Sequence, residues 1–221
     1  MKIIAIANPA GGTGKTVLSH ALAVAFAEFG KKTLLIDLDS FGSLTFRLGL
    51  ENPRVTITEF IAGVKITEEN LITTPERFDF IASDSRLTAN LNEDALAKVL
   101  EKLPKEYDVV ILDVASTLTP SLSSALNSSD HVFVPVSQSL HSLRGLIQLR
   151  KISDKPVTAI TIGAVDPEEI SPVLDVAILR SDEVENAAST NLSVLSTKKS
   201  SDVSESYRSA AYSILELLAL E

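Results

Sequence analysis

Short apolar segments alternate along the chain with longer segments in which apolar residues recur at helical spacing. The apolar segments are residues 3–7, 33–36, 78–82, 109–112, 131–136, 157–162 and 174–179. Segments that are apolar on both faces are typical of the central strands of a parallel sheet. The helical segments are residues 15–29, 92–103, 119–128, 140–152, 182–190 and 203–219. This alternation predicts a doubly wound α/β fold, in which a mostly parallel sheet is flanked by helices.

The loops that follow the predicted strands are the first place to look for function. Right-handed crossovers bring these loops together at the carboxyl edge of the sheet, where open α/β folds bind their ligands. The loops are residues 8–16, 37–45, 113–120, 137–142 and 163–170.

Composition narrows the possibilities further. The 221 residues, of which 45% are hydrophobic, predict a single domain over residues 1–221. The absence of cysteine excludes disulfides, thiolate metal sites and iron–sulfur clusters. A net charge of −9 restricts any contact with DNA to a local patch. Apolar segments are too short for a signal peptide or a membrane span, so we expect a cytoplasmic protein with no membrane contact.

A glycine-rich loop follows the first apolar segment and opens an apolar helix. It reads Gly11-Gly12-Thr13-Gly14-Lys15-Thr16 and is followed by Val17. Small residues at a helix N-terminus let backbone N–H groups approach a phosphate. Lys15 would add a positive charge at the β- and γ-phosphates, and the Thr16 hydroxyl would ligate Mg²⁺. The loop predicts a P-loop ATPase with ATP and Mg²⁺ as cofactors; the alternative is a glycine-rich turn that binds nothing.

The first glycine of the usual phosphate-loop pattern is replaced here by Pro9, and this departure points to a family. Residues 8–16 resemble the deviant Walker A box of the ParA/MinD ATPases, K-G-G-x-G-K-[ST]. Residues 34–39 resemble the second motif of the family, and residues 109–113 resemble its Walker B strand. The resemblance covers essentially the whole chain and implies a P-loop NTPase fold of the SIMIBI, ParA-like class.

The family resemblance assigns roles to three carboxylates. Asp39 matches the residue that positions the attacking water, and Asp37 lies at the strand end near the metal. Asp113 matches the Walker B aspartate, which orients a water on Mg²⁺ beside Thr16. The alternative for each carboxylate is a structural role as a cap of the turn that follows.

One family residue is missing, because Ala10 replaces the signature lysine that reaches across a dimer to the nucleotide of the partner. Family members without this lysine include McdA, which distributes carboxysomes over the nucleoid of cyanobacteria, and the sequence resembles that branch. On this resemblance we expect Lys151 to replace the missing catalytic cation, with Arg144 and Arg150 as the next candidates. The alternatives are a weakened or inactive ATPase and an ordinary solvated basic helix face.

Candidate surfaces for adenine and DNA rest on position and resemblance only. Residues 163–167 and 195–197 are the expected walls of an adenine site, with Pro167 packing on the base, although a proline is common in any turn. The resemblance implies non-specific contact with DNA phosphates, for which Lys198, Lys199 and Arg208 are candidates, together with Arg180. The three histidines lack metal-ligand spacing, and we expect structural roles for them.

The resemblance implies a positioning ATPase. ATP would close a homodimer that binds nucleoid DNA, and a McdB-like adaptor on the cargo, expected to be carboxysomes, would stimulate hydrolysis and release. Alternatives are a plasmid or chromosome partition ATPase and a metabolic P-loop enzyme such as a dethiobiotin synthetase. A MinD-like membrane regulator would need a basic amphipathic helix where residues 214–221 are acidic, and a phosphate loop that begins at residue 8 disfavours a preceding operator-binding domain.

Overall fold

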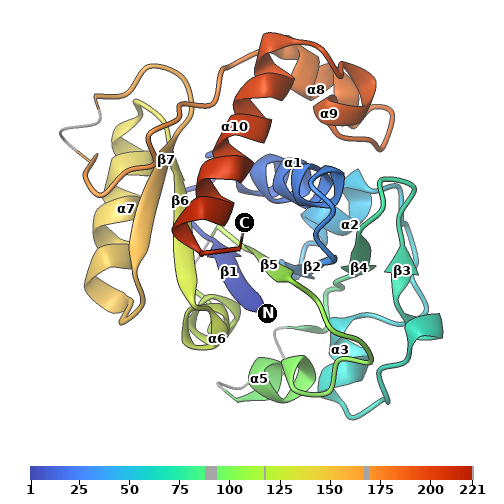
Figure 1. The fold of residues 1–221 in the computed structure, drawn as a ribbon. Coiled ribbons are helices and arrows are strands. Elements are labelled where there is room, and N and C mark those ends of the chain that lie inside the picture. The colour runs from blue at the N-terminus through green and yellow to red at the C-terminus, as the bar shows by residue number, and fades with distance from the viewer. Residues whose placement is uncertain (88–93, 117, 167–169, 221) are drawn as a thin grey trace.

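The computed structural model describes residues 1–87, 94–116, 118–166 and 170–220, and its centre is a seven-stranded sheet (Figure 1). The strand order is β3-β4-β2-β5-β1-β6-β7, and every neighbouring pair is parallel except β3 and β4. The strands are β1 (Lys2–Ile6), β2 (Thr33–Leu38), β3 (Ile72–Thr73), β4 (Asp79–Ile81), β5 (Val109–Val114), β6 (His131–Val136) and β7 (Val157–Thr161). The fold is the doubly wound α/β architecture that the alternating pattern predicts.

Helices cover both faces of this sheet. One face packs against α1 (Lys15–Glu28), α2 (Ser43–Arg47), α8 (Asp182–Ala188), α9 (Val194–Thr197) and α10 (Asp202–Leu217). The other face packs against α3 (Ile57–Ile61), α5 (Ala95–Leu100), α6 (Pro120–Ser128) and α7 (Leu140–Ile152). A short 3₁₀ turn, η1 (Glu68–Asn70), precedes β3. Strands β2, β5, β6 and β7 are buried along their whole length, which explains their continuous apolar sequences.

Polar residues at helix starts set the helix boundaries. Thr119 caps α6 by accepting a hydrogen bond from the Leu122 amide, and Pro120 occupies the first helical position, where no N–H is needed. Ser139 caps α7 and Ser201 caps α10 in the same way, each accepting from a backbone N–H in the first turn. These caps lie at or next to the starts that the sequence predicts.

One predicted strand is wrong. Residues 174–179 form no regular strand; this segment and its surroundings meet β7 only through isolated bridges, at Val173 and Ile178. Leu174 and Ile178 are buried in the core beside α1 and α10, whereas the residues between them are partly or fully exposed. The segment is therefore apolar because two of its side chains fill the core. The seventh strand is instead the two-residue β3 at the opposite edge, which is too short to show any pattern.

The strand order creates a crevice at the carboxyl edge of the sheet. β1 leads through α1 to β2 on one side of the sheet, whereas β5 leads through α6 to β6 on the other side. The loops after β1 and β5 therefore diverge at this point, which is where open α/β sheets bind ligands. No helix in the part of the chain that the structure describes is long and apolar enough to cross a membrane.

Candidate functional site

The glycine loop forms a cavity at the N-terminus of α1. Gly12 and Gly14 adopt left-handed backbone angles, with φ of 69° and 84°, which glycine tolerates at little cost. Gly14 is the residue that precedes the first turn of α1. A cavity of about 260 Å³ is lined by the loop and by the ends of β2 and β5: Gly12, Thr13, Gly14, Lys15, Thr16, Val17, Asp39, Ser43, Val114, Ala115 and Ser116. Backbone N–H groups at such a helix end favour a bound anion.

Lys15 places a buried ammonium group beside this cavity. Its Nζ donates hydrogen bonds to the carbonyl of Ala10 at 3.0 Å and to Ser116 Oγ at 2.6 Å. Burial lowers the pKa of Lys15, whereas the negative charges of Asp113 and Asp39 raise it. An anion that binds the ammonium group would replace only these two hydrogen bonds. A phosphate would also place a negative charge directly against this buried cation.

Asp113, at the end of β5, is a buried carboxylate with one oxygen unsatisfied. Oδ1 accepts a hydrogen bond of 2.7 Å from the Ser19 hydroxyl, whereas Oδ2 is buried with no hydrogen-bond partner among the described residues. Burial raises the pKa of Asp113 to about 6, although the Ser19 hydrogen bond, the nearby Thr16 hydroxyl and the charge of Lys15 act in the opposite direction. An unsatisfied buried carboxylate oxygen next to Thr16 fits a role in orienting a water on a divalent cation.

Asp37 lies beside Asp113, because the two residues are paired in the β2–β5 register. Its Oδ1 accepts from the Asp39 amide at 2.9 Å, and its Oδ2 accepts from the amide and hydroxyl of Thr45 at 2.9 and 2.8 Å. Burial, and then the charge of Asp113, raise the pKa of Asp37 to about 7. Asp37 therefore anchors α2 to the end of β2, and its role near a metal stays a prediction.

Asp39 is half-buried and faces the cavity from the β2–α2 loop. Its Oδ1 accepts from the Phe41 amide at 3.0 Å, and its Oδ2 accepts from the Ser43 hydroxyl at 2.7 Å. It also lines a neighbouring cavity of about 270 Å³ together with Ser116 and Thr119. Of the three predicted carboxylates, Asp39 is the one with direct access to the space in front of the loop.

Helix α7 holds the glycine loop from the other side, a contact that the sequence did not reveal. Asn8 Nδ2 donates to the carbonyls of Pro135 at 2.9 Å and Ser142 at 3.3 Å, and its Oδ1 accepts from the Ala10 amide at 3.0 Å. Gly145 permits the contact, because a Cβ atom there would lie 1.9 Å from Asn8 Oδ1. The available signals were an asparagine before a proline in the loop and an isolated glycine in a helical segment.

The three basic candidates on α7 differ in their surroundings. Arg150 donates to the carbonyls of Ile170 at 2.6 Å and Pro172 at 3.0 Å, so its guanidinium is engaged within the fold. Lys151 and Arg144 are exposed. Lys151 lies nine residues beyond Ser142, a rise of about 14 Å along the helix, and it lines none of the cavities at the loop. Within one subunit, Lys151 is therefore not part of the phosphate cavity.

A larger cavity of about 540 Å³ lies beside the loop and differs from the adenine site that the sequence predicts. It is lined by Gly12, Thr13, Gly14, Val17, Ser137, Ile162, Leu179, Arg180, Ser181, Asp182, Val184, Glu185 and Tyr207. The expected wall at residues 195–197 is absent from it, because α9 packs there and Leu195 is buried in the core. Pro167 lies outside the described residues. The sequence analysis did not assign residues 179–182, 184 and 185 to a cavity beside the loop, because they carry no motif.

The late basic residues also separate. Lys198 and Lys199 are exposed on the loop before α10. Arg208 pairs with Glu28 at 2.7 Å and donates to the Lys199 carbonyl at 2.7 Å, so it stabilises the fold there. Arg180 lines the 540 Å³ cavity.

Two of the three histidines make hydrogen bonds inside the fold. His20 contacts Glu76 at 2.5 Å, and His131 contacts Thr158 at 2.8 Å. These contacts are consistent with the structural roles expected for both residues.

Comparisons with known proteins agree with this architecture. Residues 1–160 match a family model described as an AAA domain. The chain is 34% identical over 159 residues to the sporulation initiation inhibitor protein Soj of Bacillus subtilis, an alignment that covers 67% of this chain and 63% of Soj. The alignments span 60–63% of the length of the first few curated relatives.

Two solved structures share the fold across nearly the whole chain. The septum site-determining protein MinD of Pyrococcus horikoshii, complexed with Mg-ADP, superposes with a TM-score of 0.85 at 21% identity and covers 99% of this chain and 98% of its own. An ATP complex of McdA from Cyanothece superposes with a TM-score of 0.80 at 20% identity, and the superposition covers 97% of this chain and 96% of the McdA chain. At these identities the likeness establishes the fold.

Proposed function

We propose a function from one premise, which is that this chain belongs to the ParA/MinD family of P-loop ATPases. The proposed reaction is the hydrolysis of ATP to ADP and phosphate, with ATP and Mg²⁺ as cofactors, in a protein that positions or partitions a cargo. The observation that carries the proposal is that the buried cation Lys15, at the N-terminus of α1, lies close enough to the buried carboxylate Asp113, at the end of β5, for the two charges to interact.

The residues of the loop have distinct proposed tasks. Backbone N–H groups of residues 11–16 hold the phosphates, and Lys15 exchanges Ala10 and Ser116 for phosphate oxygens. Val17 and the neighbouring 540 Å³ cavity accommodate the nucleoside. Thr16 and Asp113, with Asp37 behind them, would hold Mg²⁺, which neutralises charge on the phosphates.

Asp39 is the proposed water-positioning residue. Its carboxylate faces the phosphate cavity and is oriented by the Phe41 amide and the Ser43 hydroxyl. A carboxylate held in this way can accept a hydrogen bond from a water that attacks the γ-phosphate, and phosphoryl transfer depends mainly on such positioning.

The proposed active form is a homodimer closed by ATP. Ala10 carries no charge, so a cation must come from elsewhere, and we assign that role to Lys151 of the opposite subunit. Lys151 lies on the exposed face of α7, where Leu140 and Ile147 are also exposed, and this face is available for a contact between subunits. Arg144 is the alternative cation on the same face, seven residues before Lys151.

The proposed cargo cycle takes place on nucleoid DNA in the cytoplasm. Lys198 and Lys199 are the proposed contacts with DNA phosphates, and a McdB-like adaptor on the cargo stimulates hydrolysis. Carboxysomes are the proposed cargo, on the resemblance of the sequence to the McdA branch of the family. Plasmid or chromosome partition is the alternative, which relatives named as chromosome-partitioning proteins support.

The test of the proposed function is Asp39→Ala, assayed for phosphate release and for dimer formation with Mg-ATP. We expect the variant to bind ATP and to dimerise while its turnover falls at least about 10²-fold, since only water positioning is removed. Asp154→Ala, at an exposed aspartate, is the matched control and should leave turnover unchanged. Unchanged turnover in Asp39→Ala would contradict the assignment. Lys151→Ala in the same assays, with Lys155→Ala as its control, tests the proposed cation from the opposite subunit.

A further inference from the structure

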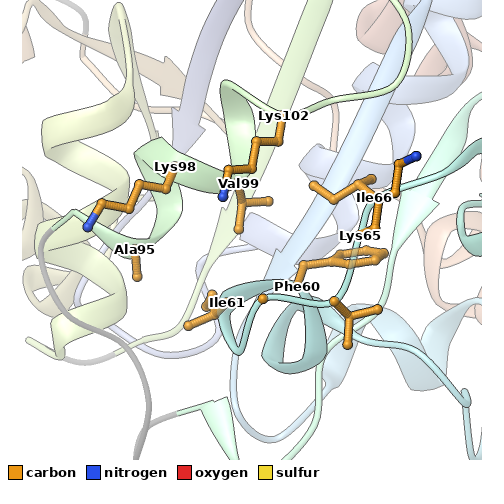
Figure 2. Close-up of a pocket in the computed structure, with 10 residues that line it drawn as sticks. Phe60, Ile61, Lys65, Ile66, Ala95, Lys98, Val99 and Lys102 are labelled. Atoms are coloured by element: carbon orange, nitrogen blue, oxygen red, sulfur yellow. The ribbon is translucent and has the colours of Figure 1, made fainter.

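A groove between α3 and α5 lies on the face of the sheet opposite α1, away from the glycine loop (Figure 2). Its volume is about 610 Å³, within the range of ligand-binding sites. It is lined by Phe60, Ile61, Gly63, Val64, Lys65, Ile66, Ala95, Lys98, Val99 and Lys102. None of these residues lines the cavities at the glycine loop.

The floor of this groove is apolar and belongs to the core. Phe60, Ile66, Ala95 and Val99 are only 3–7% exposed and pack within the hydrophobic cluster beneath the sheet. Val64 stands at the rim and is 43% exposed. The floor is thus held by the fold, and a ligand would meet a preformed apolar surface.

The rim of the groove is positively charged. Lys65, Lys98 and Lys102 are exposed, and no acidic residue is among the lining residues that the structure describes. Across the described ranges, the ion pairs of the structure involve none of these three lysines. Three exposed ammonium groups around an apolar floor would attract a ligand of opposite charge.

The arrangement of the three ammonium groups indicates the shape of the ligand. In Figure 2 the amino groups of Lys98 and Lys65 lie on opposite sides of the groove, with Lys102 between them. The three amino groups point in different directions rather than toward one place in the groove. They suit an extended ligand that carries several negative charges along its length and apolar groups between them.

We propose that this lysine-rimmed groove binds an acidic amphipathic peptide segment of a partner protein. Apolar side chains of the segment would cover Phe60, Ile61 and Val64, and its carboxylates would pair with the three lysines. The proposal goes beyond the ATPase cycle and is independent of it, because the groove shares no residue with the nucleotide cavities. It can therefore be tested without nucleotide, so its failure would leave the proposed function standing.

The test is fluorescence anisotropy of a labelled synthetic peptide with the full chain. The probe is an amphipathic peptide with leucine on one face and glutamate on the other; a second peptide replaces glutamate by glutamine and a third replaces leucine by serine. We expect only the first peptide to bind, and we expect added salt to weaken that binding.

Variants locate the binding site of the probe. The double variant Lys98→Gln with Lys102→Gln should weaken the affinity for the probe peptide about three- to tenfold, as expected for the removal of two surface ion pairs. The matched control, Lys31→Gln with Lys32→Gln, removes the same charge from residues that do not line the groove and should change nothing. Val64→Asp places a carboxylate at the rim without touching a lysine, and it should also weaken binding. Circular dichroism checks that each variant is folded.

Three results would overturn the proposal. One is that none of the peptides binds, and another is that the control pair weakens binding as much as the groove pair. The third is that vesicles of phosphatidylglycerol compete with the peptide and sediment the protein through Lys98 and Lys102, which would identify the groove as a membrane contact.

Discussion

At the residue scale, Asp37 and Asp113 are two buried carboxylates held side by side by the β2–β5 register. Burial raises both pKa values, to about 7 for Asp37 and about 6 for Asp113. The native state therefore holds protons more tightly than the unfolded chain does. The two carboxyl groups therefore lower the free energy of unfolding as pH rises from about 4 toward their native pKa values. Above those values the loss of stability is complete and stays constant.

Replacing Asp113 by Asn should therefore have its most favourable effect on the free energy of unfolding at high pH. With nucleotide and metal removed by EDTA, we expect the change in the free energy of unfolding caused by Asp113→Asn to be about 1 to 2 kcal/mol more favourable at pH 8 than at pH 5. Urea unfolding at both pH values measures it. Asp175→Asn, at an exposed aspartate, is the control and should show no such difference. An Asp113→Asn effect that is the same at pH 5 and pH 8 would rule out a raised pKa for Asp113.

Whether a residue of the site could be predicted depends on how far its partners lie from it along the chain. Lys15 and Thr16 are predictable from the loop sequence, because their spacing to Gly14 carries the chemistry. Ser116 is 101 residues from its partner Lys15, and Asn8 is 127 residues from Pro135. No local pattern records such contacts, since they exist only once the strands have been ordered in the sheet.

At the element scale, the contact of α7 with the glycine loop depends on one glycine. Gly145→Ala would place a methyl group 1.9 Å from Asn8 Oδ1, so the helix or the loop must move. We expect the free energy of unfolding to fall by about 1 to 3 kcal/mol, as overpacking does, despite the better helix propensity of alanine. ATP affinity should fall as well, because Asn8 orients the Ala10 amide.

Thermal unfolding and nucleotide titration measure these two effects. Gln148→Ala, at an exposed position of the same helix, is the control and should change stability by less than about 0.5 kcal/mol. A Gly145→Ala protein that is more stable than the wild type, as expected for an exposed helix glycine, would contradict the close contact.

Elements were predictable where pattern and caps agree. The segment 131–136 is β6, and residues 120–128 form α6 because Thr119 and Pro120 mark its start. Helix α2 has only five residues, too few to show a period, and it is held by Asp37 and Asp39 rather than by its own propensity. For the same reason, β3 and α3 could not be predicted.

At the scale of the whole molecule, the net charge of −9 makes any DNA contact depend on a few lysines. With ATP bound, we expect DNA affinity to fall steeply with salt and to be independent of DNA sequence. Lys198→Gln with Lys199→Gln should reduce the slope of log K against log salt by about 0.9 for each DNA phosphate that the variant no longer neutralises. Anisotropy with two unrelated duplexes measures the slope.

Lys31→Gln with Lys32→Gln again provides the charge-matched control for this measurement. A slope that is the same in the wild type and in the Lys198/Lys199 variant would place the DNA contact elsewhere. Binding that distinguishes the two duplexes would contradict the non-specific contact itself.

The hydrogen bonds of Lys15 have a consequence for how tightly this protein can hold its ligand. The Lys15 ammonium group donates hydrogen bonds to the Ala10 carbonyl and to the Ser116 hydroxyl. Phosphate binding is therefore an exchange of partners, and the measured affinity is the difference between two sets of hydrogen bonds. The exchange would also remove the Lys15 donor from the Ser116 hydroxyl, on the loop after β5.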